Sequence, residues 1–256
     1  MRQEATTDDE SAATAIRFSL IIPAYNEQFY LPRLLATVNR ARSKYRGGRE
    51  AIEIIVADNG STDLTADVAR RAGCRVVAVK NRVIAAARNG GARAAQGELL
   101  CFVDADSQIH PDTFTAIDAA LANGEVVAGA TGGRLERRSL GIGLTWLMFQ
   151  PMIWILGLDT GVVFCRRKDY ETVGGYNEQR FFAEDVQFLM DMKKLGRSRG
   201  QRFERVTSSR VVLSTRKFDK YGDWHSLKAL FSYPYWQLFS KCSLDNWVKA
   251  YWYEDR

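Results

Sequence analysis

The sequence predicts an α/β fold with a doubly wound, mostly parallel sheet. Short apolar segments that are typical of buried strands alternate four times with segments of helical periodicity. These strands are expected over residues 18–23, 52–57, 75–79 and 99–103. Repeated strand–helix spacing of this kind indicates right-handed crossovers, which place helices on both faces of a parallel sheet.

Each of the first three strands is followed by helix signals. Apolar residues recur at helical spacing after the first strand, and Asn26 is the expected cap of that helix. The second helix should start after a cap at Thr62 or Asp63 and end at Gly73. An alanine-rich helix is expected over residues 82–96.

The pattern changes after residue 106. The remaining elements are expected to be helices over 111–122 and 183–195, strands within 124–133 and over 161–166, and two short strands within 202–213. Without a linker that would divide the chain, we expect one domain over residues 17–215. A disordered tail (residues 1–16) would precede it, and an aromatic-rich helical extension (residues 216–256) would follow it.

One long apolar run, residues 140–158, contains no charged residue. A membrane-spanning helix needs about 20 apolar residues. Glycines dilute this run and Gln150-Pro151 should interrupt it, so we expect a buried or interfacial pair of helices rather than a span. Its partner is either the sheet or a lipid surface.

The formal net charge is +6, and its excess is local. Residues 193–220 hold ten Lys and Arg against two acidic residues, a net of +8. Such a segment suits a phosphate ligand or an anionic membrane, although a solvated surface would also explain it. The four cysteines are far apart in sequence, which excludes a zinc-type pair and favours a reducing, cytoplasmic setting.

The strand at residues 99–103 leads directly into Asp104-Ala105-Asp106. Ligands bind at the carboxyl ends of strands in open α/β sheets, and two carboxylates there suit a hard divalent cation. Alone, the triplet is equally consistent with a turn. Tyr25 and Asp58 follow the first two strands and could contact a base and a ribose, and the planar fork of Arg88 could pair with a diphosphate.

Four motifs, IIPAYNE, ADNGSTD, AARNGGARAAQGELLCFVDAD and FFAED, occur in this order. Together they resemble the family 2 glycosyltransferases of the GT-A fold, over about residues 18–195. The resemblance implies a nucleotide-binding half and an acceptor-binding half. It also implies an inverting transfer from a nucleoside-diphosphate sugar, with UDP the expected nucleotide, to an acceptor hydroxyl. The cofactor would be Mn²⁺ or Mg²⁺.

The resemblance assigns roles to particular residues. Asp185 would be the general base, with Glu184 beside it as a second catalytic residue. Asp106 would bind the metal directly, and Asp104 would face the ribose or a metal-bound water. The implied nucleotide-binding residues are Pro23, Ala24, Tyr25, Glu27, Asp58, Arg88, Asp104 and Ala105. Arg216 and Lys217 resemble a basic segment that closes over the diphosphate in some members, although a surface strand end would explain them equally well.

The chain departs from the family pattern at three places. Asn59 stands where a second acid is common, and Val83 stands where a glycine is common. The Gln-x-x-Arg-Trp motif of processive synthases is missing after Asp185, which favours addition of a single sugar.

The expected partners are the sugar nucleotide and a saccharide or lipid-linked acceptor, with no nucleic acid. We expect a cytoplasmic protein with peripheral contact at the inner face of a membrane. Two alternatives remain at this stage. A sugar-phosphate nucleotidyltransferase would usually carry a glycine-rich loop after the first strand, where this chain has PAYNE. A non-catalytic membrane-associated binding protein would use only the basic and aromatic segments.

Overall fold

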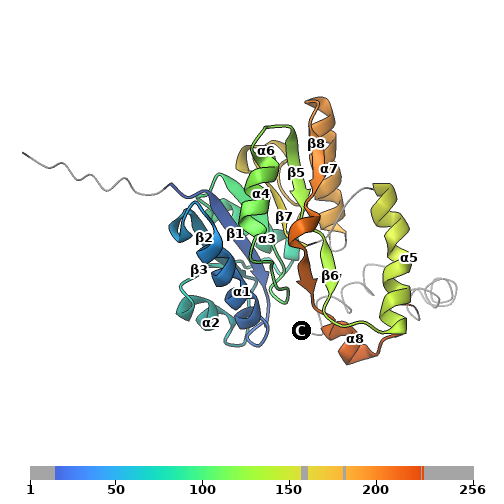
Figure 1. Cartoon of the computed structure of the whole chain (residues 1–256). Coiled ribbons are helices and arrows are strands. Elements are labelled where there is room, and N and C mark those ends of the chain that lie inside the picture. Colours follow the sequence, from blue (N-terminus) through green and yellow to red (C-terminus); the bar gives the residue numbers. More distant parts are fainter. Residues whose placement is uncertain (1–14, 157–160, 181–182, 226, 228–256) are drawn as a thin grey trace, which may run out of the picture.

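The computed structural model describes residues 15–156, 161–180, 183–225 and 227. It confirms the α/β class with a mostly parallel central sheet (Figure 1). The seven strands of that sheet lie in the order β3-β2-β1-β4-β7-β5-β8, and β6 and β9 form a second, two-stranded sheet. The expected tail over residues 1–16 and the extension from residue 216 lie largely outside the described residues.

The predicted strand–helix units form the first half of the sheet. The strands β1 (Phe18–Ala24), β2 (Ile52–Asp58), β3 (Arg75–Ala78) and β4 (Leu99–Phe102) are all parallel to one another. In the second half, β7 (Val163–Arg166) runs antiparallel to both β4 and β5 (Val126–Ala130). The short strands β6 (Gly133–Leu135), β8 (Arg202–Arg205) and β9 (Val211–Leu213) complete the two sheets.

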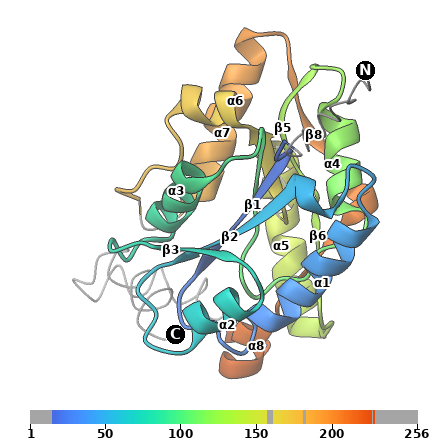
Figure 2. The same ribbon diagram turned by 90° about the vertical axis from the view of Figure 1, so that its left-hand side faces the viewer.

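Helices cover both faces of the large sheet, because successive side chains of each strand point to opposite faces. Leu20 and Ile22 of β1 face the core under α1 (Leu31–Lys44), α2 (Thr65–Arg71) and α4 (Thr113–Leu121). Ile21 faces the other core, under α3 (Ile84–Ala94), α6 (Arg167–Val173) and α7 (Glu184–Ser198). Figure 2 shows α1 and α3 on opposite sides of β1. The remaining helices are α5 (Leu140–Leu156), α8 (Arg216–Tyr221) and the 3₁₀ turns Arg49–Ala51 and Thr207–Ser209.

Two local predictions at the helix ends are corrected by the structure. Asn26 does not cap α1, which begins at Leu31, because its backbone adopts φ +53° and its side chain accepts a hydrogen bond from the Thr62 amide at 2.9 Å. The cap of α2 was predicted at Thr62 or Asp63, but the capping position is Leu64; Asp63 lies one residue earlier and accepts from the Thr65 amide at 2.9 Å. Gly73 follows α2 with φ +75°, which confirms the predicted end of that helix.

The apolar run forms one helix, α5, so the predicted interruption at Gln150-Pro151 is wrong. A proline removes one N–H group from a helix, and a helix of this length retains its other backbone hydrogen bonds around it. Of the two predicted settings, buried or interfacial, burial does not hold for the outer side of its first turns, where Leu140 and Leu147 are exposed. No helix in the described part of the chain is both long and apolar enough to cross a membrane.

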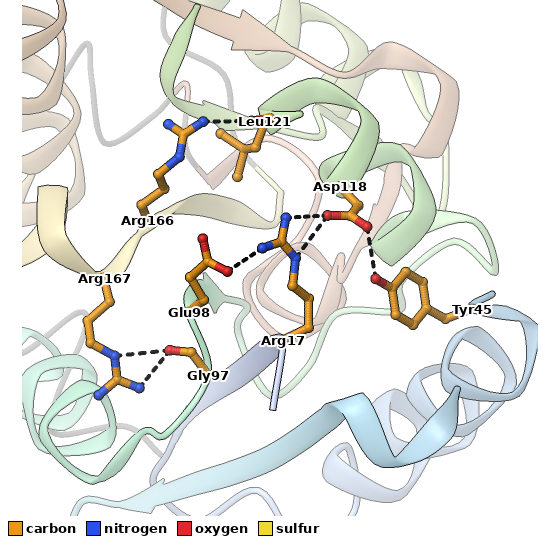
Figure 3. A network of polar contacts seen from close by, with 8 residues as sticks. All are labelled: Arg17, Tyr45, Gly97, Glu98, Asp118, Leu121, Arg166 and Arg167. Atoms are coloured by element: carbon orange, nitrogen blue, oxygen red, sulfur yellow. Dashed lines mark hydrogen bonds and ion pairs between the residues drawn. The ribbon is translucent and has the colours of Figure 1, made fainter. Parts of the chain in front are cut away.

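At the amino end of the large sheet, ion pairs of Arg17 join β1 to α4 and β4, and a hydrogen bond of Tyr45 joins the end of α1 to α4 (Figure 3). Arg17, just before β1, donates two hydrogen bonds to Asp118 of α4, at 2.7 and 3.0 Å, and also pairs with Glu98. Tyr45, after α1, donates to the other Asp118 oxygen at 2.9 Å. Arg167 donates twice to the carbonyl oxygen of the residue preceding Glu98. This network of ion pairs and hydrogen bonds stabilises the amino end of the sheet, which is opposite to the predicted site.

Candidate active site

The predicted site residues follow strands that lie side by side. The loop 25–27 follows β1, Asp58 ends β2, and Asp104-Ala105-Asp106 lies two residues beyond β4. Since these three strands are parallel neighbours, their carboxyl ends form one edge. The first turn of α7 carries Glu184 and Asp185.

Arg88 joins the acidic triplet to α7. Its guanidinium donates to Glu184 at 2.7 Å and to Asp104 at 3.1 Å. It also lies 5.1 Å from the centre of the Tyr176 ring, in cation–π range. The Arg88 side chain is only 9% exposed, so both of its carboxylate partners are held by a cation that is shielded from water. One buried arginine of α3 therefore sets the position of Asp104 relative to the start of α7.

The charges in this cluster depend on one another. Burial alone would lower the pKa of the Arg88 guanidinium, but the negative charges around it, those of Asp104 and Glu184 among them, raise that pKa above its ordinary value. Burial raises the pKa of the Glu184 carboxyl, while the Arg88 charge acts in the opposite direction. Arg88 therefore stays charged, and its charge opposes the effect of burial on the pKa of Glu184.

A second arginine, Arg216 at the start of α8, holds the other half of the site. It donates to both carboxylate oxygens of buried Glu27, at 2.6 and 2.7 Å, in a bidentate pair. Its Nε lies 3.0 Å from Asp106 Oδ2, and its guanidinium lies 4.8 Å from the centre of the Tyr30 ring. Burial would lower the pKa of Arg216, but its bonds with Glu27 and the charge of Asp106 raise it. Arg216 was predicted either to close over a diphosphate or to end a surface strand; in the structure it contacts the carboxylates of Glu27 and Asp106.

The two aspartates of the triplet are thus separated by their partners, Asp104 with Arg88 and Asp106 with Arg216. No group of three or more His, Cys, Asp or Glu side chains that could hold a metal occurs within the described residues. A divalent cation would still fit this chemistry, because Asp106 offers hard oxygen donors and phosphate and water complete such shells.

Tyr25 and Asp58 lie where a nucleoside was predicted. The guanidinium of Arg82 lies 4.3 Å from the centre of the Tyr25 ring. Asp58 accepts a hydrogen bond from the Ser61 amide at 3.1 Å, which shapes the turn after β2. Pro23 pairs with Ala57 inside the sheet, so Pro23 contributes to this edge through the backbone of β1.

Asn59, the departure from the family pattern, has a definite structural role. Its buried side-chain amide donates to the carbonyl oxygens of Val79, at 3.3 Å, and Asn81, at 2.6 Å. A carboxylate could not donate these bonds. Asn59 therefore ties the end of β2 to the segment that carries Arg82.

Asn89 is a residue of the site region that the sequence analysis did not assign. Its side-chain oxygen accepts from the Tyr170 hydroxyl and the Tyr176 amide, at 2.5 and 2.9 Å. Its side-chain nitrogen donates to the Tyr176 carbonyl and to Glu178, at 2.8 and 2.9 Å. This buried residue ties α3 to the segment that leads to α7, and its place next to Arg88 was the available signal.

The backbone is strained at two places that flank the site. Asn26 and Ala183 are the only non-glycine residues with positive φ in the described part of the chain, at 53° and 54°. Asn26 precedes Glu27, and Ala183 precedes Glu184. Left-handed backbone outside glycine is unfavourable and concentrates at functional sites.

A cavity of about 470 Å³ lies away from the site, between β3 and α3, and the acidic residues of the site do not line it.

A parallel sheet that gathers carboxylates and arginines at its carboxyl edge defines a class of α/β enzymes that bind phosphorylated ligands there. The glycosyl transferase family 2 model matches residues 19–197. The chain belongs to this family.

Curated relatives resemble the chain over less than half of its length. The undecaprenyl-phosphate 4-deoxy-4-formamido-L-arabinose transferase of Pseudomonas paraeruginosa is 36% identical over 119 residues, 44% of this chain and 34% of that protein. The validoxylamine A glucosyltransferase of Streptomyces hygroscopicus subsp. limoneus is 36% identical over 124 residues, 45% of this chain and 26% of that protein. The matched segment therefore spans about a third or less of these relatives.

Solved structures confirm the GT-A fold. S. aureus TarS residues 1–349 in complex with UDP has a TM-score of 0.61 at 21% identity, covering 81% of this chain and 63% of that chain. Glucosyl-3-phosphoglycerate synthase from Mycobacterium tuberculosis, in complex with Mn²⁺, UDP and glucosyl-3-phosphoglycerate, has a TM-score of 0.58 at 20% identity. It covers 91% of this chain and 85% of that chain.

Proposed function

We propose that this chain is an inverting, metal-dependent glycosyltransferase that moves a sugar from a UDP-sugar to an acceptor hydroxyl. The observation that carries the proposal is the bridge made by Arg88. Its hydrogen bonds connect Asp104, on the donor side, with Glu184, which stands next to the proposed base Asp185. Arg88 therefore fixes the position of the proposed donor side relative to the helix that carries the proposed base.

The nucleoside would lie against the carboxyl ends of β1 and β2. Tyr25 offers an aromatic face, and Asp58 offers a carboxylate to the ribose or base. Pro23 and Ala24 would line this site as the last residues of β1, with Glu27 and Ala105 holding its loops. Because both ends of the Arg88 fork already bind carboxylates, we assign Arg88 to positioning these acids rather than to gripping the diphosphate.

Asp106, with Asp104 beside it, would hold Mn²⁺ or Mg²⁺ against the diphosphate. Such an ion neutralises charge on the departing nucleoside diphosphate. Related structures support this choice of ligands: the M. tuberculosis synthase is described with Mn²⁺ and UDP, and a mannosyltransferase from Pyrobaculum calidifontis with GDP-Man and Mn²⁺. Because the second structure contains GDP-Man, the experiment below compares sugar nucleotides with different bases.

Asp185 would take the proton of the acceptor hydroxyl as its oxygen attacks the anomeric carbon. The bond from that carbon to the diphosphate oxygen breaks, and the electron pair leaves with the nucleoside diphosphate. One displacement inverts the anomeric centre. Asp185 lies in the first turn of α7, and its Oδ1 accepts from the Val186 amide at 2.8 Å. The positive end of the helix dipole favours the ionised carboxylate that a base needs.

The acceptor side is the least defined. A saccharide or lipid-linked hydroxyl suits the family, and the P. paraeruginosa relative is named for undecaprenyl phosphate. A cytoplasmic location is supported by the free thiols of Cys74, Cys101 and Cys165, because unpaired buried cysteines suit a reducing compartment.

The test compares Asp185→Asn with Asp191→Asn, a matched change on the same helix. Asp185→Asn should lower transfer from UDP-sugars about a thousandfold, the size of lost general-base catalysis, while UDP still binds. Asp191→Asn should transfer as the wild type does. Binding would be measured as a metal-dependent thermal shift with UDP-, GDP- and dTDP-sugars. Full activity of Asp185→Asn, or nucleotide binding that Asp106→Asn leaves unchanged, would overturn the proposal.

A further inference from the structure

The first turns of α5 carry their apolar side chains on the outside. A surface helix normally turns its apolar face toward the core and its polar face toward water. In α5 the inner face holds Gly141, Ile142 and Thr145, which are buried, and the Thr145 hydroxyl donates to the Gly141 carbonyl at 2.9 Å. The outer face is exposed and apolar: Leu140 (82%), Leu144 (47%), Leu147 (65%) and Met148 (37%).

The spacing of these four residues places them on one side of the helix. Residues separated by three, four or seven positions lie above one another on an α-helix. No charged residue interrupts the sequence from residue 140 to 158. Figure 1 shows α5 at the side of the molecule, with α8 at its lower end. The four side chains thus form one apolar strip, which we call the α5 face.

Ion pairs hold the segment that contains α8 against the start of α5, and this segment adds to the exposed surface. Arg137 pairs with Asp219 at 2.8 Å and with Asp223 at 2.6 Å. Gly141 lets the two segments pack closely, because a Cβ there would lie 2.6 Å from the Asp223 carbonyl oxygen. Beyond this junction, Tyr221 and Trp224 are exposed, Trp224 by 49%.

The charged residues where α8 meets the start of α5 carry a small positive excess. Arg137 pairs with Asp219 and Asp223, and Arg138 and Lys220 add two positive charges, so three cations against two acids leave a net of +1. Leucine, tryptophan and tyrosine with Lys and Arg beside them suit the boundary between lipid tails and headgroups. A second copy of this chain would bring the same basic residues against one another, which opposes association. An anionic lipid surface would suit both features, because its acyl chains would contact the apolar strip and its charged headgroups would attract the basic end.

We propose that the α5 face, with Tyr221 and Trp224, docks on an anionic lipid bilayer. This surface is one short helix away from the site, because α8 begins with Arg216, which contacts Asp106. Docking would therefore hold the carboxyl edge of the sheet next to the membrane. Lipid binding goes beyond the proposed sugar transfer and does not depend on it, whereas presentation of a lipid-linked acceptor rests on that function.

The experiment is flotation of the full-length chain with vesicles, without sugar nucleotide. The vesicles contain phosphatidylcholine alone or phosphatidylcholine with an equal part of phosphatidylglycerol. The wild type should float with the anionic vesicles, and less so with phosphatidylcholine alone or at high salt. Leu144→Glu combined with Leu147→Glu should lower the bound fraction at least tenfold, because two charges replace apolar side chains at the interface. The control is Met190→Glu, which places a charge at an exposed apolar position of α7 and should float as the wild type does.

Two further measurements separate the outcomes. Thermal unfolding and Mn²⁺-dependent UDP binding of the double variant should match the wild type, since its side chains are exposed and lie outside the site. Light scattering reports the mass of each variant. Flotation that is absent, that the double variant retains, or that Met190→Glu loses equally would overturn the proposal. A dimer that depends on Leu144 and Leu147, without vesicle binding, would assign the α5 face to a second copy instead.

Discussion

Arg216 Nε lies 3.0 Å from Asp106 Oδ2 in an ion pair, although the two residues are 110 positions apart in the chain. The other two nitrogens of the same guanidinium bind Glu27. The second aspartate of the triplet, which we propose as the metal ligand, thus already has a cationic partner supplied by α8. A divalent cation arriving at Asp106 must compete with that partner.

Replacing Arg216 by Gln should strengthen metal binding to the nucleotide-free protein. The change removes one positive charge from Asp106 and Glu27, and a half-shielded ion pair is worth about 1 kcal/mol, roughly a fivefold change in Kd. Arg216→Lys keeps the charge and should change the Kd less. Mn²⁺ titration followed by electron paramagnetic resonance measures this. An unchanged or weaker affinity for Mn²⁺ in Arg216→Gln would contradict the competition.

Replacing Arg88 by Met should destabilise the protein in a pH-dependent way. Loss of one partner of a buried pair typically costs about 3–5 kcal/mol of unfolding free energy, because the other charge stays buried. Here the stranded group is Glu184, whose pKa burial already raises. A folded carboxyl with a raised pKa holds its proton more tightly than the unfolded chain does, so stability falls as pH rises above the ordinary glutamate value of about 4.3.

The loss of stability in Arg88→Met, relative to wild type, should therefore be larger at pH 8 than at pH 5. Urea unfolding at both pH values measures it. Combining Arg88→Met with Glu184→Gln removes the stranded charge and should recover part of the stability at pH 8. Equal losses at both pH values would show that packing, and not the charge of Glu184, is what Arg88 supports.

Restoring the acid that is common in the family at position 59 should weaken this protein. Asn59→Asp loses two donated hydrogen bonds and places a carboxylate against two carbonyl oxygens, which should cost about 2–3 kcal/mol of unfolding free energy. Since the affected segment carries Arg82, which stacks on Tyr25, UDP binding should weaken as well. Urea unfolding and calorimetry check both effects. The control is Asn123→Asp, an exposed turn residue whose side-chain oxygen accepts the Glu125 amide and is retained.

Replacing Arg17 by Met should lower stability without changing catalysis. Arg17 joins β1, α4 and β4 at the amino end of the sheet, far from the carboxyl edge (Figure 3). Its side chain is about a third exposed, so we expect a loss of only about 1–2 kcal/mol. Asp118→Asn and the double variant complete a double-mutant cycle. Transfer rates per folded molecule should equal the wild-type rate; a lower rate would mean that this network also shapes the site.

The strand–helix order was predictable because it depends on local periodicity. Residues 99–103 are apolar at every position, and residues 99–102 form the buried strand β4 beside β1. Local signals were misleading where another segment supplied the deciding contact. Asn26 is a good helix cap by type, yet its side chain binds Thr62, which comes from the next strand–helix unit.

By itself, the sequence determined the α/β class, the family and the gathering of acids at one edge of the sheet, since each follows from the order of short segments. Only the tertiary structure decided which charges are paired. Arg88 and Glu184 are 96 residues apart, and Arg216 and Glu27 are 189 apart. It also decided that Leu140, Leu144 and Leu147 of α5 face outward. Long-range pairing and the side that a helix presents depend on how distant segments pack, and no local pattern encodes that packing.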